Sequence, residues 1–128
     1  MGDYFDDADV ISIYTRSQAI EDGVLVDVSE LAREAGFRLP CAITAGVHAL
    51  LKDIPEGSGE DFTGRLWDVL TLAEQAARRA PNKAAVFIDV ILHTPDKPRG
   101  KTPKPLWMTI GPGDDPAPVL TIMLPEED

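Results

Sequence analysis

The chain has 128 residues, about the size of one domain, and 44% of them are hydrophobic, which suffices for a core without disulfides or bound metal. It carries 22 acidic against 12 basic residues, a net charge of −10. There is no apolar run long enough to span a membrane and no basic start of a secretory signal, and the single cysteine, Cys41, cannot form an internal disulfide. We therefore expect a soluble, single-domain protein of the cytoplasm.

The acidic residues are unevenly distributed. Residues 1–34 contain nine of them against two arginines, and the chain ends on three more. Residues 1–9 are predicted to form an acidic flexible arm ahead of a single α+β domain over residues 10–128. Such a surface repels phosphate, so we expect no direct binding of nucleic acid. It would attract a basic protein surface, or serve only to keep the protein dispersed.

The first ordered elements are expected to be a short strand over residues 10–14 and a short helix. Thr15 and Gln18 have the spacing of a capping box, in which two side chains bind the free N–H groups at a helix start. Gly23 suits the left-handed stop that ends many helices.

Short elements continue in the next segment. The β-branched residues at 24–28 predict a strand, and Ser29 is expected to cap a second short helix over residues 30–35. Pro40 suits the first turn of a helix, so we expect a third helix over residues 41–52.

The fourth helix has the most regular pattern in the sequence, and Pro81 would end it. Its apolar residues recur at helical spacing and form one stripe: Leu66, Val69, Leu70, Ala73, Ala76, Ala77 and Ala80.

The last third of the chain changes to strand patterns, at residues 84–93, 106–110 and 119–124. A basic, proline-rich loop is expected over residues 97–104, either solvated or in contact with an acidic partner or a phosphate, and a turn over residues 111–116. Three successive strands with turn-rich connections predict an antiparallel meander. The fold class is therefore α+β, with about four helices packed on a small, mainly antiparallel sheet that includes this C-terminal three-stranded meander.

No set of residues has the spacing of a catalytic or metal site. His48 and His93 are far apart in the sequence, and the N-terminal aspartates lack the glycine and distal glutamate of an EF-hand. Cys41 stands near a predicted helix N-terminus, but His48 would lie roughly 10 Å farther along that helix. We expect a buried structural cysteine, no metal, no cofactor and no catalytic residue.

The candidate binding residues are one aromatic and several acidic side chains. Trp107 lies on a predicted strand, out of phase with its apolar neighbours, and is either a partner anchor or an edge of the core. Asp114 and Asp115 follow two glycines in a predicted hairpin turn, where they would repel phosphate. With the aspartates of the arm, the candidate set is Trp107, Asp114, Asp115, Asp6, Asp7 and Asp9.

Three stretches taken together, at residues 13–28, at residues 64–70 and at residues 111–115 with 122–125, carry a family resemblance. The chain resembles a family of short uncharacterised bacterial proteins found on chromosomes, plasmids and phages. The resemblance implies a role in defence, counter-defence or plasmid upkeep, and it is weakest around residues 41–59.

A second resemblance concerns the start of the domain. Tyr14, Thr15 and Arg16, a short helix and then Gly23 are similar to the opening of ADP-ribosyltransferase-like folds. This implies that Tyr14 and Arg16 would line a pocket for NAD. The late glutamate of those enzymes would have to be Glu126 or Glu127.

Three hypotheses follow. The first is a non-catalytic acidic binding protein, an accessory factor of mobile elements that engages a basic protein surface in the manner of an anti-restriction or anti-CRISPR protein. The second is an NAD-using enzyme of the ADP-ribosyltransferase type. The third is a structural homodimeric scaffold joined through an exposed strand edge.

Overall fold

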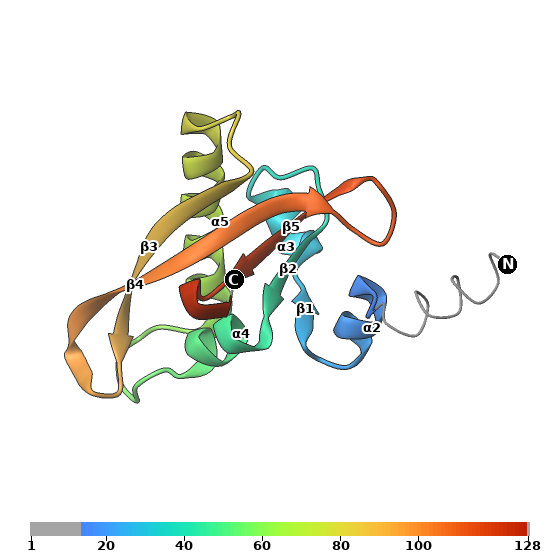
Figure 1. Cartoon of the computed structure of the whole chain (residues 1–128). Coiled ribbons are helices and arrows are strands. Elements are labelled where there is room, and N and C mark those ends of the chain that lie inside the picture. Colours follow the sequence, from blue (N-terminus) through green and yellow to red (C-terminus); the bar gives the residue numbers. More distant parts are fainter. Residues whose placement is uncertain (1–13, 128) are drawn as a thin grey trace, which may run out of the picture.

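In the computed structural model, which describes residues 14–127, the chain folds into four α-helices, five strands and a short 3₁₀ helix (Figure 1). The acidic arm expected over residues 1–9 lies outside the described residues, as does all but Tyr14 of the strand expected over residues 10–14. In chain order the elements are α2 (Arg16–Glu21), β1 (Leu25–Asp27), α3 (Ser29–Glu34), β2 (Cys41–Thr44), α4 (Ala45–Lys52), α5 (Phe62–Arg79), β3 (Ala85–Thr94), β4 (Lys97–Pro112), β5 (Pro118–Met123) and the 3₁₀ helix η1 (Pro125–Glu127).

The strands form one mixed sheet with the order β1-β2-β5-β4-β3. β3, β4 and β5 make the expected antiparallel meander, in which Phe87 lies opposite Trp107 and Ile110 opposite Leu120. β2 pairs antiparallel with β1 and parallel with β5. The predicted class, α+β with about four helices on a small, mainly antiparallel sheet, is confirmed.

The helices lie on both faces of this sheet. Residues of α3, α4 and α5 form one core with the inner face of the sheet, and this core includes Cys41 and Ile43 of β2. Ala42 points to the opposite face, yet it is fully buried, and α2 lies on that side, with the Arg16 side chain bound to Thr121 next to Ala42. Three of the four helices therefore cover one face of the sheet, and α2 lies on the other. None of the helices within residues 14–127 is long and apolar enough to cross a membrane.

The local signals for α2 and α5 are confirmed. Thr15 and Gln18 form the capping box at the start of α2, and Gly23 follows its end with a φ of 81°. α5 buries Leu66, Val69, Leu70 and Ala73 of the predicted stripe and ends at Arg79, ahead of Pro81.

The helix expected over residues 41–52 is wrong in its first turn. Residues Cys41–Thr44 form strand β2, and the helix begins only at Ala45, with the Thr44 hydroxyl capping it by accepting the N–H of Val47. Pro40 therefore precedes a strand, and its carbonyl accepts the N–H of Leu120. A short apolar run has no periodicity that separates strand from helix, and here the pairing with β5, far along the chain, decides.

The cap expected at Ser29 is also wrong. Val28 occupies the cap position of α3 without a side-chain bond, and Ser29 is the first helical residue. The Ser29 hydroxyl instead accepts the N–H of Cys41 at 2.9 Å and contacts the Asp27 carboxylate at 2.6 Å. It thereby joins the start of α3 to strand β2.

The basic segment 97–104 is strand rather than loop. β4 begins at Lys97, directly after a turn at residues 95–96, and its pairing with β3 is irregular between Leu92 and Thr94. β5 accompanies β4 only from Trp107 to Pro112, so the prolines of this segment stand where β4 has no neighbour on the β5 side. Proline is tolerated at such an edge because no ladder bond needs its missing N–H.

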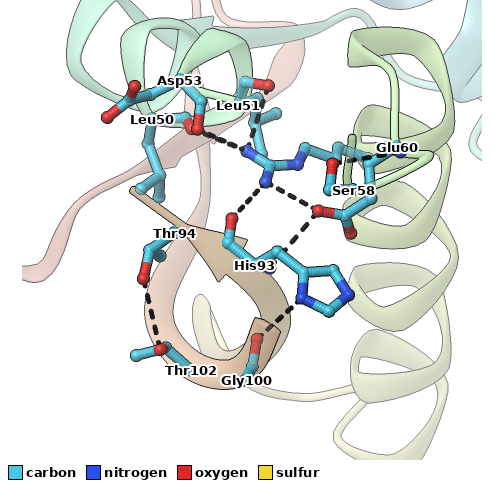
Figure 2. Close-up of polar contacts among 10 residues, drawn as sticks. Leu50, Leu51, Asp53, Ser58, Glu60, His93, Thr94, Gly100 and Thr102 are labelled. Atoms are coloured by element: carbon cyan, nitrogen blue, oxygen red, sulfur yellow. Dashed lines mark hydrogen bonds and ion pairs between the residues drawn. The ribbon is translucent and has the colours of Figure 1, made fainter. Parts of the chain in front are cut away.

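One charged side chain lies at the centre of the helix layer. Arg65 of α5 is 2% exposed, and its guanidinium donates to the backbone carbonyls of Leu50, Asp53 and His93 (Figure 2). It also donates to the Glu60 carboxylate at 2.8 Å, which in turn accepts the N–H of His93. The arginine thus binds the end of α4, the loop before α5 and the end of β3 together.

The charge of this cluster is balanced within the cluster. Burial alone would raise the pKa of Glu60, but the bonds and charge of Arg65, together with the His93 N–H, outweigh it and hold this pKa below its usual value. The carboxylate is therefore ionised beside the buried guanidinium. Sequence analysis missed Arg65, although it precedes the buried Val69 by one helical turn and so stands in the apolar stripe.

We expect Arg65→Met to lower the free energy of unfolding by about 3–5 kcal/mol, because it leaves several buried carbonyls and the half-buried Glu60 carboxylate without their donor. Urea unfolding followed by circular dichroism would measure this. The matched control is Arg78→Met on the same helix, where Arg78 pairs with Glu74 at the surface and 76% of its side chain is exposed. That change should cost about 0–1 kcal/mol. Equal losses for the two variants would contradict the role assigned to Arg65.

Candidate functional site

Three of the predicted site residues meet at the start of α2. Tyr14, Arg16 and Asp114 line an open cavity of about 390 Å³, together with parts of β1 and of the turn after β4. Tyr14 and Arg16 were predicted from one resemblance and Asp114 from the acidic turn, so the structure joins two sets that sequence analysis kept apart.

Asp114 serves as an additional cap of α2. Its carboxylate accepts the N–H of Arg16 at 2.6 Å and the N–H of Ser17 at 3.1 Å. These backbone bonds favour the charged form and hold the pKa of Asp114 below its usual value. The two helix N–H groups that the capping box leaves open are thereby satisfied across 98 residues of sequence.

The guanidinium of Arg16 is bound to the sheet. It donates to the Thr121 hydroxyl and to the Leu120 carbonyl, both at 2.7 Å, and burial lowers its pKa. Tyr14 donates its hydroxyl to Asp22 at 2.7 Å, and this bond raises the pKa of Tyr14, which stays a phenol. Arg16 thus holds α2 on the sheet, and Tyr14 bonds to the residue that follows α2, an arrangement that does not favour their use as NAD ligands.

The late glutamate required by that resemblance is also engaged. The Glu127 carboxylate accepts the Thr44 hydroxyl at 2.7 Å and the N–H of Leu124 at 2.8 Å. Glu126 is exposed and lies on η1 beside a different cavity, with Leu50 and Lys104. The cavity at Arg16 is lined by neither of them.

Cys41 is buried inside the sheet rather than at a helix start. It is 1% exposed, and burial raises the pKa of its thiol to about 12. His48, the base considered from the sequence, packs on the ring of Phe62 with 5.1 Å between ring centres. The thiol is therefore protonated and inaccessible, and among residues 14–127 no group of three or more potential ligands could hold a metal ion.

Trp107 lies apart from the acidic turn. Pro112 stands five positions farther along β4, roughly 17 Å along the strand. It is half-buried on the outer face of the sheet, against Phe87 of β3, with 3.8 Å between ring centres. Phe87 is itself 63% exposed, and the Trp107 indole N–H is buried without a partner among the described residues. Sequence analysis missed Phe87, although it is out of phase with Val86 and Ile88.

The exposed charges separate along the sheet. The acidic end, as we name it, comprises exposed residues of α2, β1, α3 and the turn after β4: Glu21, Asp22, Asp27, Glu30, Glu34, Asp114 and Asp115. At the other end of β4, which spans roughly 50 Å, the exposed residues Lys97, Arg99 and Lys101 surround the β3–β4 turn (Figure 1). The predicted Asp6, Asp7 and Asp9 lie outside the described residues.

A comparison with protein families places the chain. It matches the model of a family of unknown function, DUF6573, over residues 1–128. The chain belongs to this family. No curated protein and no solved structure matches the chain.

We expect Asp114→Asn to weaken the start of α2. Amide hydrogen exchange of Arg16 and Ser17, followed by NMR at neutral pH, should become faster. Asp115→Asn is the matched control, because within residues 14–127 the Asp115 carboxylate accepts only the N–H of Ala117 in its own turn. Unchanged exchange in Asp114→Asn would contradict the assignment.

The stability contributed by Asp114 should depend on pH in a defined direction. Its pKa is lower in the folded chain, so its contribution is complete above the pH at which the unfolded carboxyl ionises and is lost as the pH falls through the lowered pKa. Urea unfolding of wild type and Asp114→Asn over a pH series should show a gap at neutral pH that closes in acid. A gap that stays constant would argue against an ionised cap.

Cys41 should resist alkylation in the folded protein, since its thiol is buried and protonated. Iodoacetamide at mildly alkaline pH should leave the native chain unmodified by mass spectrometry and modify it once guanidinium unfolds it. A chain that also carries Thr63→Cys, at an exposed position of α5, should gain one modification in the native state. Rapid labelling of Cys41 in the native chain would contradict this prediction and indicate an accessible, reactive thiol.

Proposed function

We propose that this protein is a non-catalytic binding protein whose acidic end engages a basic surface on another protein. The observation that carries the proposal is the gathering of seven exposed carboxylates on α2, β1, α3 and the turn after β4. Two exposed arginines stand against them, Arg33 on α3 and Arg38 in the segment after α3, while Arg16 is bound to the sheet. Such a one-sided field attracts oppositely charged surfaces over a distance.

The carboxylates of the acidic end lie on a segment that hydrogen bonds hold in place. Asp114 and Asp22 are fixed by bonds to the start of α2 and to Tyr14, and α2 is held on the sheet through Arg16. Charges on an ordered frame give a defined pattern, and a defined pattern can select among basic partners as well as attract them. The side chains with reactive potential, Arg16, Cys41 and Arg65, are engaged in internal contacts or buried, which supports binding over catalysis.

Within this proposal, the resemblance to proteins of bacterial chromosomes, plasmids and phages suggests a mobile-element accessory factor. A basic surface that normally holds nucleic acid would be its target, as for an anti-restriction or anti-CRISPR protein. Carboxylates would then take the place of phosphates, and association would weaken with salt.

The proposal is tested with a neutralised acidic end. The triple variant Glu21→Gln, Glu30→Gln, Glu34→Gln removes three exposed charges that take part in no hydrogen bond or ion pair within residues 14–127. The matched control removes three exposed charges elsewhere, by Asp53→Asn, Glu56→Gln and Glu126→Gln. Each tagged protein is used to capture partners from a bacterial lysate, with mass spectrometry as the readout.

Wild type and control should enrich the same proteins with basic nucleic-acid-binding surfaces, and the acidic-end variant should lose them. At about 1 M salt, where the Debye length is about 3 Å, the wild type should lose them too. Capture that survives high salt, or that is equal for the two triple variants, would overturn the proposal.

A further inference from the structure

The two ends of the sheet's strand order differ in length and in what lies beside them. β1, at one end, has three residues. β3, at the other, has ten, and pairs with β4 on one side only. A long strand with one open edge presents a row of N–H and C=O groups to another chain.

Hydrogen bonds at both ends of β3 show which backbone groups face this open edge. The carbonyl of Ala84, just before the strand, accepts the N–H of Ile110 on β4, so even-numbered positions turn toward β4. The N–H and C=O of His93 bond to Glu60 and Arg65 instead, so odd-numbered positions turn away. Glu60 and Arg65 cover the edge at His93, whereas Phe87, Asp89 and Ile91 direct their backbone groups outward.

A second stretch of strand without a neighbour is protected in a different way. Beyond the end of β5, β4 carries Pro103 and Pro105, which lie opposite Ile91 and Asp89 of β3. By the same alternation their nitrogens point to the β5 side, where no N–H is then offered to another strand. β3 has no proline between Ala85 and Thr94, so its edge keeps every donor.

α5 runs beside β3 (Figure 1). Two hollows lie between α5 and this edge. One, of about 630 Å³, is lined by Ala76, Arg79, Ala80 and Lys83 with Ala85, Val86, Phe87 and Trp107. Another, of about 260 Å³, is lined by Asp68, Thr71, Leu72, Val90 and Ile91. Their strand residues are about four apart, roughly 13 Å along an extended chain.

We call the strip between β3 and α5 that contains both hollows the furrow. The charged residues that line it differ in sign from one end to the other. Arg79 and Lys83 border the larger hollow and form no ion pair with any residue from 14 to 127. Asp68 borders the smaller one. An extended peptide running antiparallel to β3 would bring a positive N-terminal part to Asp68 and a negative C-terminal part to Arg79 and Lys83.

We propose that the furrow between β3 and α5 binds an extended peptide segment of a partner protein, which adds to the sheet as a sixth strand antiparallel to β3. Backbone bonds to Phe87, Asp89 and Ile91 give affinity, and two apolar side chains four residues apart fill the hollows. An acidic residue follows the second apolar residue and lies against Arg79 and Lys83. This surface is separate from the acidic end, and the proposal does not depend on it.

The test uses a phage-displayed library of random nine-residue peptides selected on the full chain, with enriched peptides then synthesised and titrated by fluorescence anisotropy. We expect enriched sequences with apolar residues four apart followed by Asp or Glu. Asp89→Pro removes one outward N–H without touching a bond to β4, and it should weaken binding by about tenfold or more. Asp89→Ala, which keeps the N–H, should bind within about twofold of wild type, and Lys83→Glu should weaken only peptides with the acidic end.

Unfolding midpoints of the variants identify any that merely fail to fold, and Lys83→Glu then stands as the independent variant. Selection of no common pattern, or equal binding to Asp89→Pro and Asp89→Ala, would overturn the proposal. A wild-type dimer in sedimentation that Asp89→Pro dissolves would overturn it as well, because the edge would then belong to a second copy of this chain. The acidic-end triple variant should bind the peptides like wild type, which separates this result from the proposed function.

Discussion

The packing of the helix layer depends on one buried guanidinium. Arg65 donates to carbonyls at the end of α4, and it joins them to the end of β3 and to Glu60 in the loop before α5. Desolvating an arginine is costly, and the cost is offset only because nearly every donor finds an acceptor; Nε alone has none among the described residues. The geometry therefore permits one relative position of α4, α5 and β3. The shape of the furrow therefore depends on how α5 is placed relative to β3.

On the opposite face of the sheet, α2 is also held by side-chain hydrogen bonds, some of them more exposed than those of Arg65. The helix has six residues, too few to be stable alone, so its place depends on tertiary bonds. Asp114 binds its first N–H groups, and Arg16 reaches down to β5. The same carboxylate that extends the negative surface thus anchors the helix that carries Glu21 and Asp22. Removing the Asp114 carboxylate therefore both reduces the negative charge of the acidic end and weakens the bonds that hold α2.

What the sequence could predict was local. Residues close together in the sequence determine the capping box of Thr15 and Gln18, the apolar stripe from Leu66 to Ala80 and the three C-terminal strands. These predictions are confirmed. Two of the failures concern partners distant in sequence. Cys41–Thr44 is a strand because β5 lies beside it, and the partners of Arg65 are mainly backbone carbonyls, which no side-chain pattern records. Asp114 and Arg16 were both predicted as site residues, each from a different motif. Neither motif predicts that the Asp114 carboxylate accepts the N–H of Arg16.

The acidic end and the β3 edge suit different steps of recognition. Carboxylates spread over α2, β1 and α3 act through a field that reaches about a Debye length and discriminates weakly between basic surfaces. The edge acts only on contact, and it discriminates by backbone pairing and by the fit of side chains into hollows. A partner with a basic surface and an extended segment ending in acidic residues would satisfy both, drawn first by charge and then fixed by the added strand. The proline-bearing stretch of β4 supports this division, since Pro103 and Pro105 offer no N–H to an added strand, whereas β3 keeps its outward donors at Phe87, Asp89 and Ile91.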